Sequence, residues 1–172
     1  SIPASRTSRP LRAHAVRSPL TPPGHTGDGL RMGRGAGPWI EDSFSNAAAW
    51  GPASLFPRRD GSVGRFFHLI DRAKPGVIAV TRDGRRFTNE SQNYHDFVRA
   101  MIDACAGRQD VSAFVICDHR TLRRYGLGAV SQSPLPVFPY LRSGYLKFGR
   151  PPHDLAVYAG LRPGTSERTV EA

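Results

Sequence analysis

Tyr94 is the residue of this sequence whose type and place most clearly suggest acid–base chemistry. The segment before it, GVIAVTRDGRRFTNESQ (76–92), predicts a strand, a turn and a return arm that leads into a helix carrying this tyrosine. A strand, turn and return arm leading into a helix can hold one side chain rigidly over a ligand. A phenol has a pKa of about 10 in water, so a phenol that acts as a base needs neighbours that stabilise the phenolate. His95 and Arg99 are candidates by proximity, while a lone tyrosine on an amphipathic helix is otherwise an ordinary packing residue.

The segment predicted to position Tyr94 has three parts before the helix. The apolar run at 77–80 is a strand candidate, Arg82-Asp83-Gly84 is turn chemistry, and Arg86-Phe87-Thr88 begins the return arm. Asn89 or Ser91 can cap a helix that continues to about Ala106. We expect structural roles for Arg86 and Glu90, with Arg86 pairing with Glu90 or with another acid.

The other elements are predicted from periodicity and from Gly and Pro positions. The pattern predicts an α+β protein with a small sheet and helices segregated around it. The expected elements are a short helix at 28–36 capped by Thr26 or Asp28, an irregular stretch at 38–64, a short strand or turn at 65–70, a strand at 111–118 buried on both faces, a helix at 119–125 stopped by Gly126, a loop at 126–139, an extended segment at 141–148, and helical turns at 154–159 and 165–170.

Three stretches in sequence order resemble a known family. They are the pattern G-x-I-x-V-x-x-x-G-x-R-F-x-N-E beginning at Gly76, the stretch TGDGLRMGRGAG (26–37) and the stretch SAFVICDHRTLRRYG (112–126). Together they resemble the FAD-dependent fumarate reductase and succinate dehydrogenase flavoprotein superfamily. The details SQNYHDF and PYLRSGYL resemble its 3-ketosteroid dehydrogenase branch. The resemblance covers roughly residues 24–171.

The resemblance implies a domain organisation. Residues 24–40 would be part of an FAD-binding domain, and residues 41–172 would be a substrate-capping domain with a small mixed sheet and helices, rejoining the FAD domain near its C-terminal end. Residues 1–23 are basic, contain no acid and are expected to be disordered. The G-x-G-x-x-G turn of a flavin domain is missing from 1–23, so we expect an internal fragment of the enzyme.

The resemblance also implies site residues. Gly27, Asp28 and Gly29 would lie against FAD, and Tyr94 would act as a base near C2 of a 3-keto steroid or other enone while hydride leaves C1 for the flavin. Without the resemblance, the glycine turn is simply a capped helix start and Tyr94 an ordinary residue of an amphipathic helix. Tyr140 and Tyr145 could line a substrate pocket, or they could anchor a loop. The intact family member is an enzyme, whereas we expect this chain alone neither to hold FAD tightly nor to turn over.

Composition leaves two alternatives to an oxidoreductase fragment. The net charge of +10 comes almost wholly from arginine, which fits either a module that binds nucleic acid or acidic partners, or a coding bias. The scattered arginines favour the coding bias. An inert truncated product is the second alternative. The six histidines lack metal-ligand spacing, and Cys105 and Cys117 are expected to be reduced thiols of a cytoplasmic protein. The sequence contains no run of about 18 apolar residues, so we expect no membrane span.

Overall fold

The structure is a computed structural model that describes residues 24, 26–37, 49–108 and 110–149. These residues form helices and small antiparallel sheets, so the expected α+β class is confirmed. The chain divides into two compact units, Ser1–Ala49 and Trp50–Ala172, and each is described by itself. The domain boundaries inferred from the sequence stay a prediction. The expected disordered segment at 1–23 and the helical turns expected at 154–159 and 165–170 lie outside the described residues.

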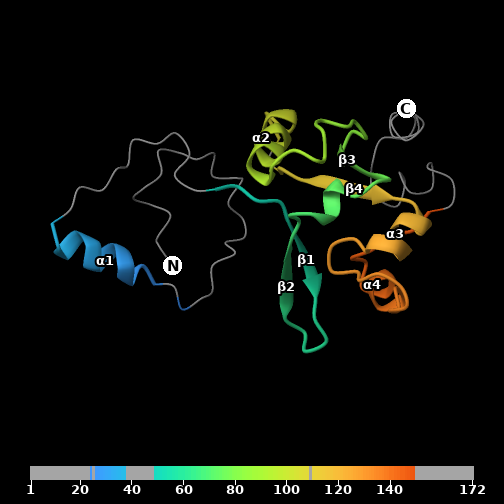
Figure 1. The fold of residues 1–172 in the computed structure, drawn as a ribbon, viewed down its shortest axis with the longest axis horizontal. Helices are drawn as coiled ribbons and strands as arrows, with labels where there is room; N and C mark the ends of the chain where they lie inside the picture. Colours follow the sequence, from blue (N-terminus) through green and yellow to red (C-terminus); the bar gives the residue numbers. More distant parts are fainter. Residues whose placement is uncertain (1–23, 25, 38–48, 109, 150–172) are drawn as a thin grey trace. The chain divides into compact units, whose positions relative to one another are not determined.

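Figure 1 shows the elements in chain order. The first unit contains one described helix, and the second contains two two-stranded antiparallel sheets with short helices around them. The elements are α1 (Asp28–Gly35), β1 (Ala53–Pro57), β2 (Val63–Phe67), the 3-10 helix η1 (Asp71–Ala73), β3 (Val77–Thr81), α2 (Tyr94–Ala104), β4 (Ala113–Cys117), α3 (His119–Tyr125) and α4 (Phe138–Arg142).

Strands β1 and β2 form a hairpin in a stretch that the sequence predicted to be largely irregular. Ala53 pairs with Phe67 and Pro57 with Val63 at the two ends of the ladder. The turn between them is closed by Asp60, whose carboxylate accepts hydrogen bonds from the N–H and the hydroxyl of Ser62 at 2.9 and 2.7 Å. The prolines at 52 and 57 suggested a broken segment, but Pro52 lies just before β1 and Pro57 is its last residue, and a proline is tolerated at both places.

Strand β3 forms where the β-branched run predicted it, but its main partner is different. The expected return arm at 86–88 contributes only an isolated bridge between Val80 and Arg86, and β3 pairs along its whole length with β4. The tight turn is present, with the N–H of Gly84 donating to the Thr81 carbonyl at 2.9 Å. The hairpin prediction was therefore wrong in its second arm, because a distant apolar strand offers β3 a longer ladder than the polar residues after the turn.

Helix α2 begins later than expected, at Tyr94. Asn93 is its N-cap, and its side-chain oxygen accepts from the N–H of Asp96 at 2.9 Å. The earlier candidates lie in the turn before the helix, where the Asn89 side chain accepts from the N–H of Ser91 at 2.9 Å. The consequence is that Tyr94 occupies the first position of the helix, where the N-cap fixes the backbone.

Helix α3 forms at the predicted residues. The Asp118 carboxylate caps it by accepting from the N–H of Thr121 at 2.6 Å, and Gly126 ends it with a φ of 73°. The loop after it is as expected until α4, which replaces the first part of the segment predicted to be extended. A proline lies in the first turn of α4, where its missing N–H costs nothing.

The core of the second unit lies around β3. Ala79 and Val80 are fully buried, and Phe97 and Val98 of α2 are buried with them. Strand β4 was expected to be buried on both faces, but each of its residues is half-buried, because β3 is its only strand partner in the described sheet and a cavity lies along it.

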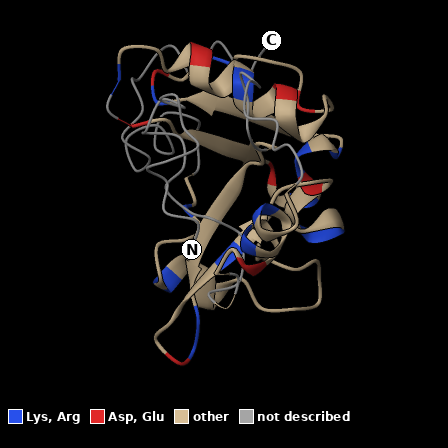
Figure 2. Cartoon of the chain, turned by 90° about the vertical axis from the view of Figure 1, so that its left-hand side faces the viewer, with Lys and Arg blue, Asp and Glu red and all other residues tan. Residues whose placement is uncertain are grey.

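The charged residues of the described chain are interspersed. Figure 2 shows Lys and Arg positions spread over several helices and turns, with Asp and Glu positions among them. Within the described ranges no helix is long and apolar enough to cross a membrane.

Candidate active site

Arg72 anchors the segment that leads into α2. Its side chain is buried, and its guanidinium donates to the carbonyl oxygen of Glu90, to that of Gln92 at 2.5 Å and to that of His68 at 3.2 Å. The guanidinium carbon lies 4.7 Å from the centre of the Phe97 ring. Burial lowers the pKa of Arg72, while the charges of Asp71 and Glu90 work to raise it. Arg72 of η1 therefore holds the segment that leads into α2 through hydrogen bonds to the backbone carbonyls of that segment.

Glu90 anchors the same segment from the other side. Its carboxylate is buried and accepts from the N–H of Ala79 at 2.8 Å and from Arg86 Nε at 2.9 Å. Burial works to raise its pKa, but the hydrogen bonds from Arg86 and Ala79 hold the pKa of Glu90 below its ordinary value. The expected pairing of Arg86 with Glu90 is confirmed, with the second contact, Nη2 to Oε2, at 2.5 Å.

Tyr94 stands at the end of this doubly anchored segment. Its ring packs edge-on against Phe67 of β2, with centroids 5.8 Å apart, and 39% of the residue is exposed. His95, which the sequence offered as a neighbour for the phenol, instead accepts a hydrogen bond from the N–H of Trp50 at 3.2 Å. The arrangement places a partly exposed tyrosine on a fixed backbone at the surface of this unit.

Gly27, Asp28 and Gly29 lie in the first unit, at the start of α1. Gly27 is the N-cap with a φ of 84°, a conformation that favours glycine, and no side chain caps the helix, although Thr26 or Asp28 was expected to do so. Thr26 donates to the Asp28 carboxylate instead, at 3.0 Å. A Cβ added at Gly29 would meet no atom within 4 Å. The Asp28 carboxylate also pairs with Arg31, and the role of this helix start in holding a cofactor stays a prediction.

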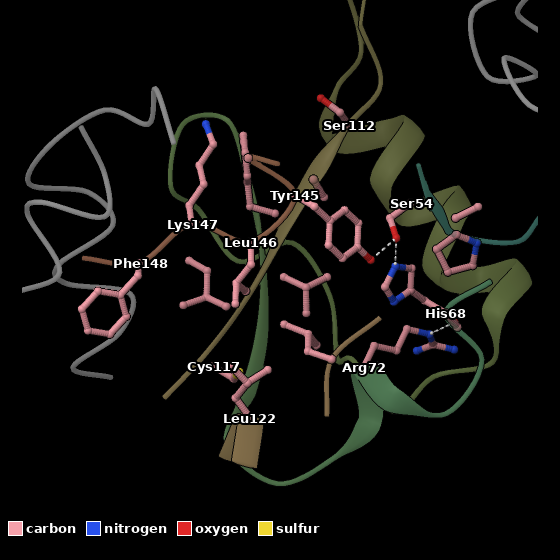
Figure 3. Close-up of a pocket in the computed structure, with 18 of the residues that line it drawn as sticks. Ser54, His68, Arg72, Ser112, Cys117, Leu122, Tyr145, Leu146, Lys147 and Phe148 are labelled. Atoms are coloured by element: carbon pink, nitrogen blue, oxygen red, sulfur yellow. Dashed lines mark hydrogen bonds between the residues drawn. The ribbon is translucent and has the colours of Figure 1, made fainter. Parts of the chain in front are cut away.

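A cavity of about 660 Å³ lies along β4 in the second unit. Figure 3 shows apolar side chains such as Leu122 and Leu146 around it, and the polar ends of Ser54, His68 and Tyr145 pointing toward one another on one side. Tyr94 is not among the residues that line it. The cavity and Tyr94 are therefore two separate features of this unit.

Tyr140 and Tyr145, the two tyrosines expected near a substrate, lie together. Their ring centroids are 5.9 Å apart, and Tyr145 alone of the pair lines the cavity. The Tyr145 hydroxyl lies 2.7 Å from Ser54 Oγ and accepts from the N–H of Ala129 at 3.1 Å. Whether either tyrosine binds a substrate stays a prediction.

A chain of polar side chains continues from Tyr145, and sequence reasoning missed it. Ser54 Oγ lies 2.8 Å from His68 Nε2, and His68 Nδ1 lies 2.6 Å from Asp71 Oδ2. His68 and Asp71 stand three positions apart, a spacing that could have suggested their contact. Ser54 and Tyr145 are 91 positions apart, and no local pattern signals that contact.

The two cysteines are free thiols, as expected. Cys105 is buried, and Cys117 lines the cavity at the end of β4. Burial, together with the charge of Asp118, raises the pKa of Cys117 to about 11, so the thiol is protonated at neutral pH. Among the described residues no three His, Cys, Asp or Glu side chains form a group that could hold a metal ion.

Comparison with known proteins gives consistent matches. A model of the family described as FAD binding domain matches residues 5–171. The chain is 38% identical over 147 residues to 4-oxocyclohex-2-ene-1-carboxylate 5-dehydrogenase of Sinomonas cyclohexanicum, covering 86% of this chain and 25% of that protein. It is 35% identical over 166 residues to 4-oxocyclohexanecarboxylate 2-dehydrogenase of the same organism, covering 94% and 27%. The chain thus spans about a quarter of the length of these relatives.

A solved structure matches as well. The crystal structure of 3-ketosteroid delta1-dehydrogenase from Sterolibacterium denitrificans, in complex with 1,4-androstadiene-3,17-dione, is similar with a TM-score of 0.68 and 26% identity. The match covers 88% of this chain and 27% of that one. The sequence relatives and the structural neighbour are all named as dehydrogenases, and the matching family model is that of an FAD binding domain.

Proposed function

The chain belongs to the FAD binding domain family, and from this premise we propose that it supplies part of an FAD-dependent dehydrogenase that acts on a CH–CH bond beside a ring ketone. The observation that carries the proposal is Tyr94: an exposed phenol at the first position of α2, on a segment fixed by Arg72 and Glu90. The names of the relatives describe dehydrogenation next to a ring carbonyl. That reaction needs a group that removes a proton.

Gly27, Asp28 and Gly29 are the residues of the first unit that would hold the cofactor. The uncapped start of α1 offers backbone N–H groups to phosphate, and the Asp28 carboxylate can accept from a hydroxyl group. The bound flavin would accept the hydride in this reaction.

Tyr94 would remove the proton from the carbon next to the ketone. Carbon acidity beside a carbonyl makes this the proton that a base takes first, and the orientation of the base sets the rate. The N-cap at Asn93 and the ring of Phe67 fix that orientation. Tyr94 thus serves as the base, and Arg72 and Glu90 serve as positioning residues.

The substrate class that we favour is a monocyclic oxo acid. The two relatives with the higher identity act on 4-oxocyclohexene and 4-oxocyclohexane carboxylates, and the steroid dehydrogenase structure has the lower identity, 26%. A 3-keto steroid is the alternative. Both substrates present a ring ketone to the same base, so the two differ in what surrounds the ring.

Two experiments test the proposal. In the first, the 172-residue chain is mixed with FAD and passed through gel filtration, which measures retained flavin. In the second, the matching segment of the Sinomonas cyclohexanicum 5-dehydrogenase is replaced by this chain, and flavin content and dehydrogenation of both substrate classes are measured. We expect the exchanged enzyme to hold flavin and to oxidise the oxo acid faster than the steroid.

The variant Tyr94→Phe in the exchanged enzyme tests the residue role. We expect retained flavin and a rate lower by about 10²–10⁴, the usual contribution of a positioned acid or base. Tyr125→Phe, at the end of α3, is the matched control and should leave the rate unchanged. An unchanged rate in Tyr94→Phe would remove Tyr94 from the mechanism, and an exchanged enzyme that holds flavin but oxidises neither substrate would refute the proposed function.

A further inference from the structure

Four side chains from distant parts of the second unit form one continuous hydrogen-bonded path. It runs from Tyr145 through Ser54 of β1 and His68 to Asp71 of η1, with distances of 2.7, 2.8 and 2.6 Å between successive polar atoms. Tyr145, Ser54 and His68 line the cavity of about 660 Å³ (Figure 3). Asp71 lines a second cavity, of about 550 Å³. The path therefore crosses the wall between two cavities.

With a neutral His68 ring, the partners give each hydrogen bond in the path one direction. Burial works to raise the pKa of Asp71, but the hydrogen bond and charge of His68 and the N–H of Gly128 hold it below the ordinary value, so the side chain is a carboxylate that only accepts. His68 Nδ1 must then donate to it, which leaves Nε2 of a neutral ring as an acceptor. Ser54 consequently donates to His68, and the Tyr145 hydroxyl donates to Ser54.

We propose that Tyr145 is an acid–base group of the cavity in its own right, and that Ser54 and His68 form the path by which its phenol proton leaves and returns. When the phenol gives up its proton, the Tyr145 O–H bond breaks, Ser54 takes that proton and passes its own to His68 Nε2. One proton has moved and the net charge is unchanged: a neutral phenol and a neutral imidazole become a tyrosinate anion and an imidazolium cation. The Asp71 carboxylate then faces the imidazolium directly.

The loop after α3 is built to support both ends of this path. The N–H of Gly128 donates to Asp71 Oδ2 at 2.9 Å, and the N–H of the next residue, Ala129, donates to the Tyr145 oxygen at 3.1 Å. Gly128 has a φ of 59°, and an added Cβ would overlap the Tyr145 hydroxyl and lie 3.0 Å from the His68 ring. Consecutive backbone donors thus meet the two oxygens that carry negative charge in the ionised state.

The carboxylate end also has capacity for a positive partner. Asp71 Oδ1 is buried and has no hydrogen-bond partner among the described residues. His68 is buried as well, and a buried charge is tolerated where an opposite charge contacts it. Arg72 is the other charged group beside His68, but its guanidinium is engaged with the carbonyls of Glu90 and Gln92. Asp71 is thus the group that compensates an imidazolium at this position.

The ligand that suits Tyr145 has an apolar body and one group that exchanges a proton or reacts with a phenolate. The walls of the cavity supply the apolar contact through Phe114, Ile116 and Leu122. This inference does not depend on the proposed function, because it concerns a different tyrosine from Tyr94 and no flavin takes part in it.

The test is the rate at which benzenesulfonyl fluoride modifies Tyr145 in the 172-residue chain at neutral pH. The phenolate oxygen forms the S–O bond as the S–F bond breaks and fluoride leaves, so the rate reports how readily the proton departs. Peptide mapping by mass spectrometry follows Tyr145 and, in the same sample, Tyr140, a half-buried neighbour 5.9 Å away. We expect Tyr145 to react faster than Tyr140 by at least about tenfold, because a positioned proton acceptor contributes about 10²–10⁴-fold.

Matched variants separate the proton path from packing. Ser54→Ala and His68→Phe should each slow the modification of Tyr145 by about tenfold or more and leave Tyr140 unchanged. Ser54→Thr keeps a hydroxyl in a strand position and should restore the rate. Equal rates for Tyr145 and Tyr140 in the unmodified sequence would overturn the proposal. An unchanged rate of Tyr145 modification in both Ser54→Ala and His68→Phe would overturn it too. So would a slow rate of Tyr145 modification in Ser54→Thr while Tyr140 reacts normally.

Discussion

Replacing Arg72 with methionine should destabilise the second unit strongly, because one buried guanidinium satisfies three backbone carbonyls. Hydrogen bonds that involve a charged group contribute about 1.5–3 kcal/mol each. The gross loss is therefore roughly 4.5–9 kcal/mol, and part of it is offset because a buried charge no longer has to be dehydrated. The net loss expected is about 3–5 kcal/mol, because three carbonyls lose this donor at about 1–3 kcal/mol each and part of that cost is offset.

The assay is the free energy of unfolding of the 172-residue chain, followed by circular dichroism in urea and by thermal melting. A loss of this size lowers the melting temperature by on the order of 10 °C in a domain of this length. Arg99→Met is the matched control, since Arg99 lies exposed on α2 and should change the unfolding free energy by less than about 0.5 kcal/mol. If Arg72→Met costs less than about 1 kcal/mol, the carbonyls it contacts have other partners and the anchoring argument fails.

Three further changes test other parts of the same framework. Because the pKa of Glu90 is lowered in the folded chain, its contribution to stability is present above about pH 4.5 and is lost as the pH falls through the lowered value. Glu90→Gln should therefore weaken the decrease of the unfolding free energy at acid pH. If the unfolding free energies of Glu90→Gln and of the unchanged sequence fall in parallel with pH, the prediction is contradicted. Gly128→Ala should cost about 1–3 kcal/mol, whereas Gly61→Ala, with a φ of 79° and open space for a Cβ, should cost less in the same melts. Asn93→Ala should cost about 0.5–2 kcal/mol through the lost N-cap, and a loss confined to less than that range would mean that Asp96 finds another acceptor.

Local chemistry decided which elements could be predicted from the sequence. Helix α3 has its cap, Asp118, and its stop, Gly126, within nine residues, and both signals act on the helix itself. Strand β3 is similarly local, since its β-branched residues favour an extended chain wherever it pairs. Its partner is not local: the choice of β4 over the return arm depends on how many ladder bonds each offers, which the sequence of either strand alone does not contain.

The first hairpin had a signal that could have found it. Asp60-Gly61 is a turn pair of the kind that joins two strands, and apolar residues lie on both sides of it. The prolines at 52 and 57 outweighed this signal because they were weighed as interruptions of a segment. They mark the ends of β1, which is where a missing N–H does not break a ladder.

The contacts of the candidate site also divide into local ones, which the sequence could predict, and ones between distant residues, which it could not. The ion pair of Arg86 with Glu90 is four residues apart and could be predicted, whereas the contacts of Arg72 with the carbonyls before α2 span 18 and 20 positions and involve backbone atoms that no motif identifies. The family motif around Tyr94 indicates a residue type at one place. What holds the phenol there is a buried arginine from another element.

Two consecutive residues of η1 serve the two sites. Asp71 faces His68 and the Gly128 amide, and Arg72 faces the carbonyls that precede Tyr94. Neighbouring positions in a 3-10 helix point about 120° apart, so one short turn can hold two networks, which meet at His68: its ring contacts Asp71 and its carbonyl oxygen accepts from Arg72. Asp71 and Arg72 are adjacent in the chain, so the hydrogen bonds of either side chain also fix the backbone of the other residue. A displacement of η1 would therefore change both the position of Tyr94 and the hydrogen bond of His68. The slowing of Tyr145 modification by Ser54→Ala avoids that coupling, since Ser54 lies on β1 and contacts neither Arg72 nor Glu90 through any hydrogen bond described above.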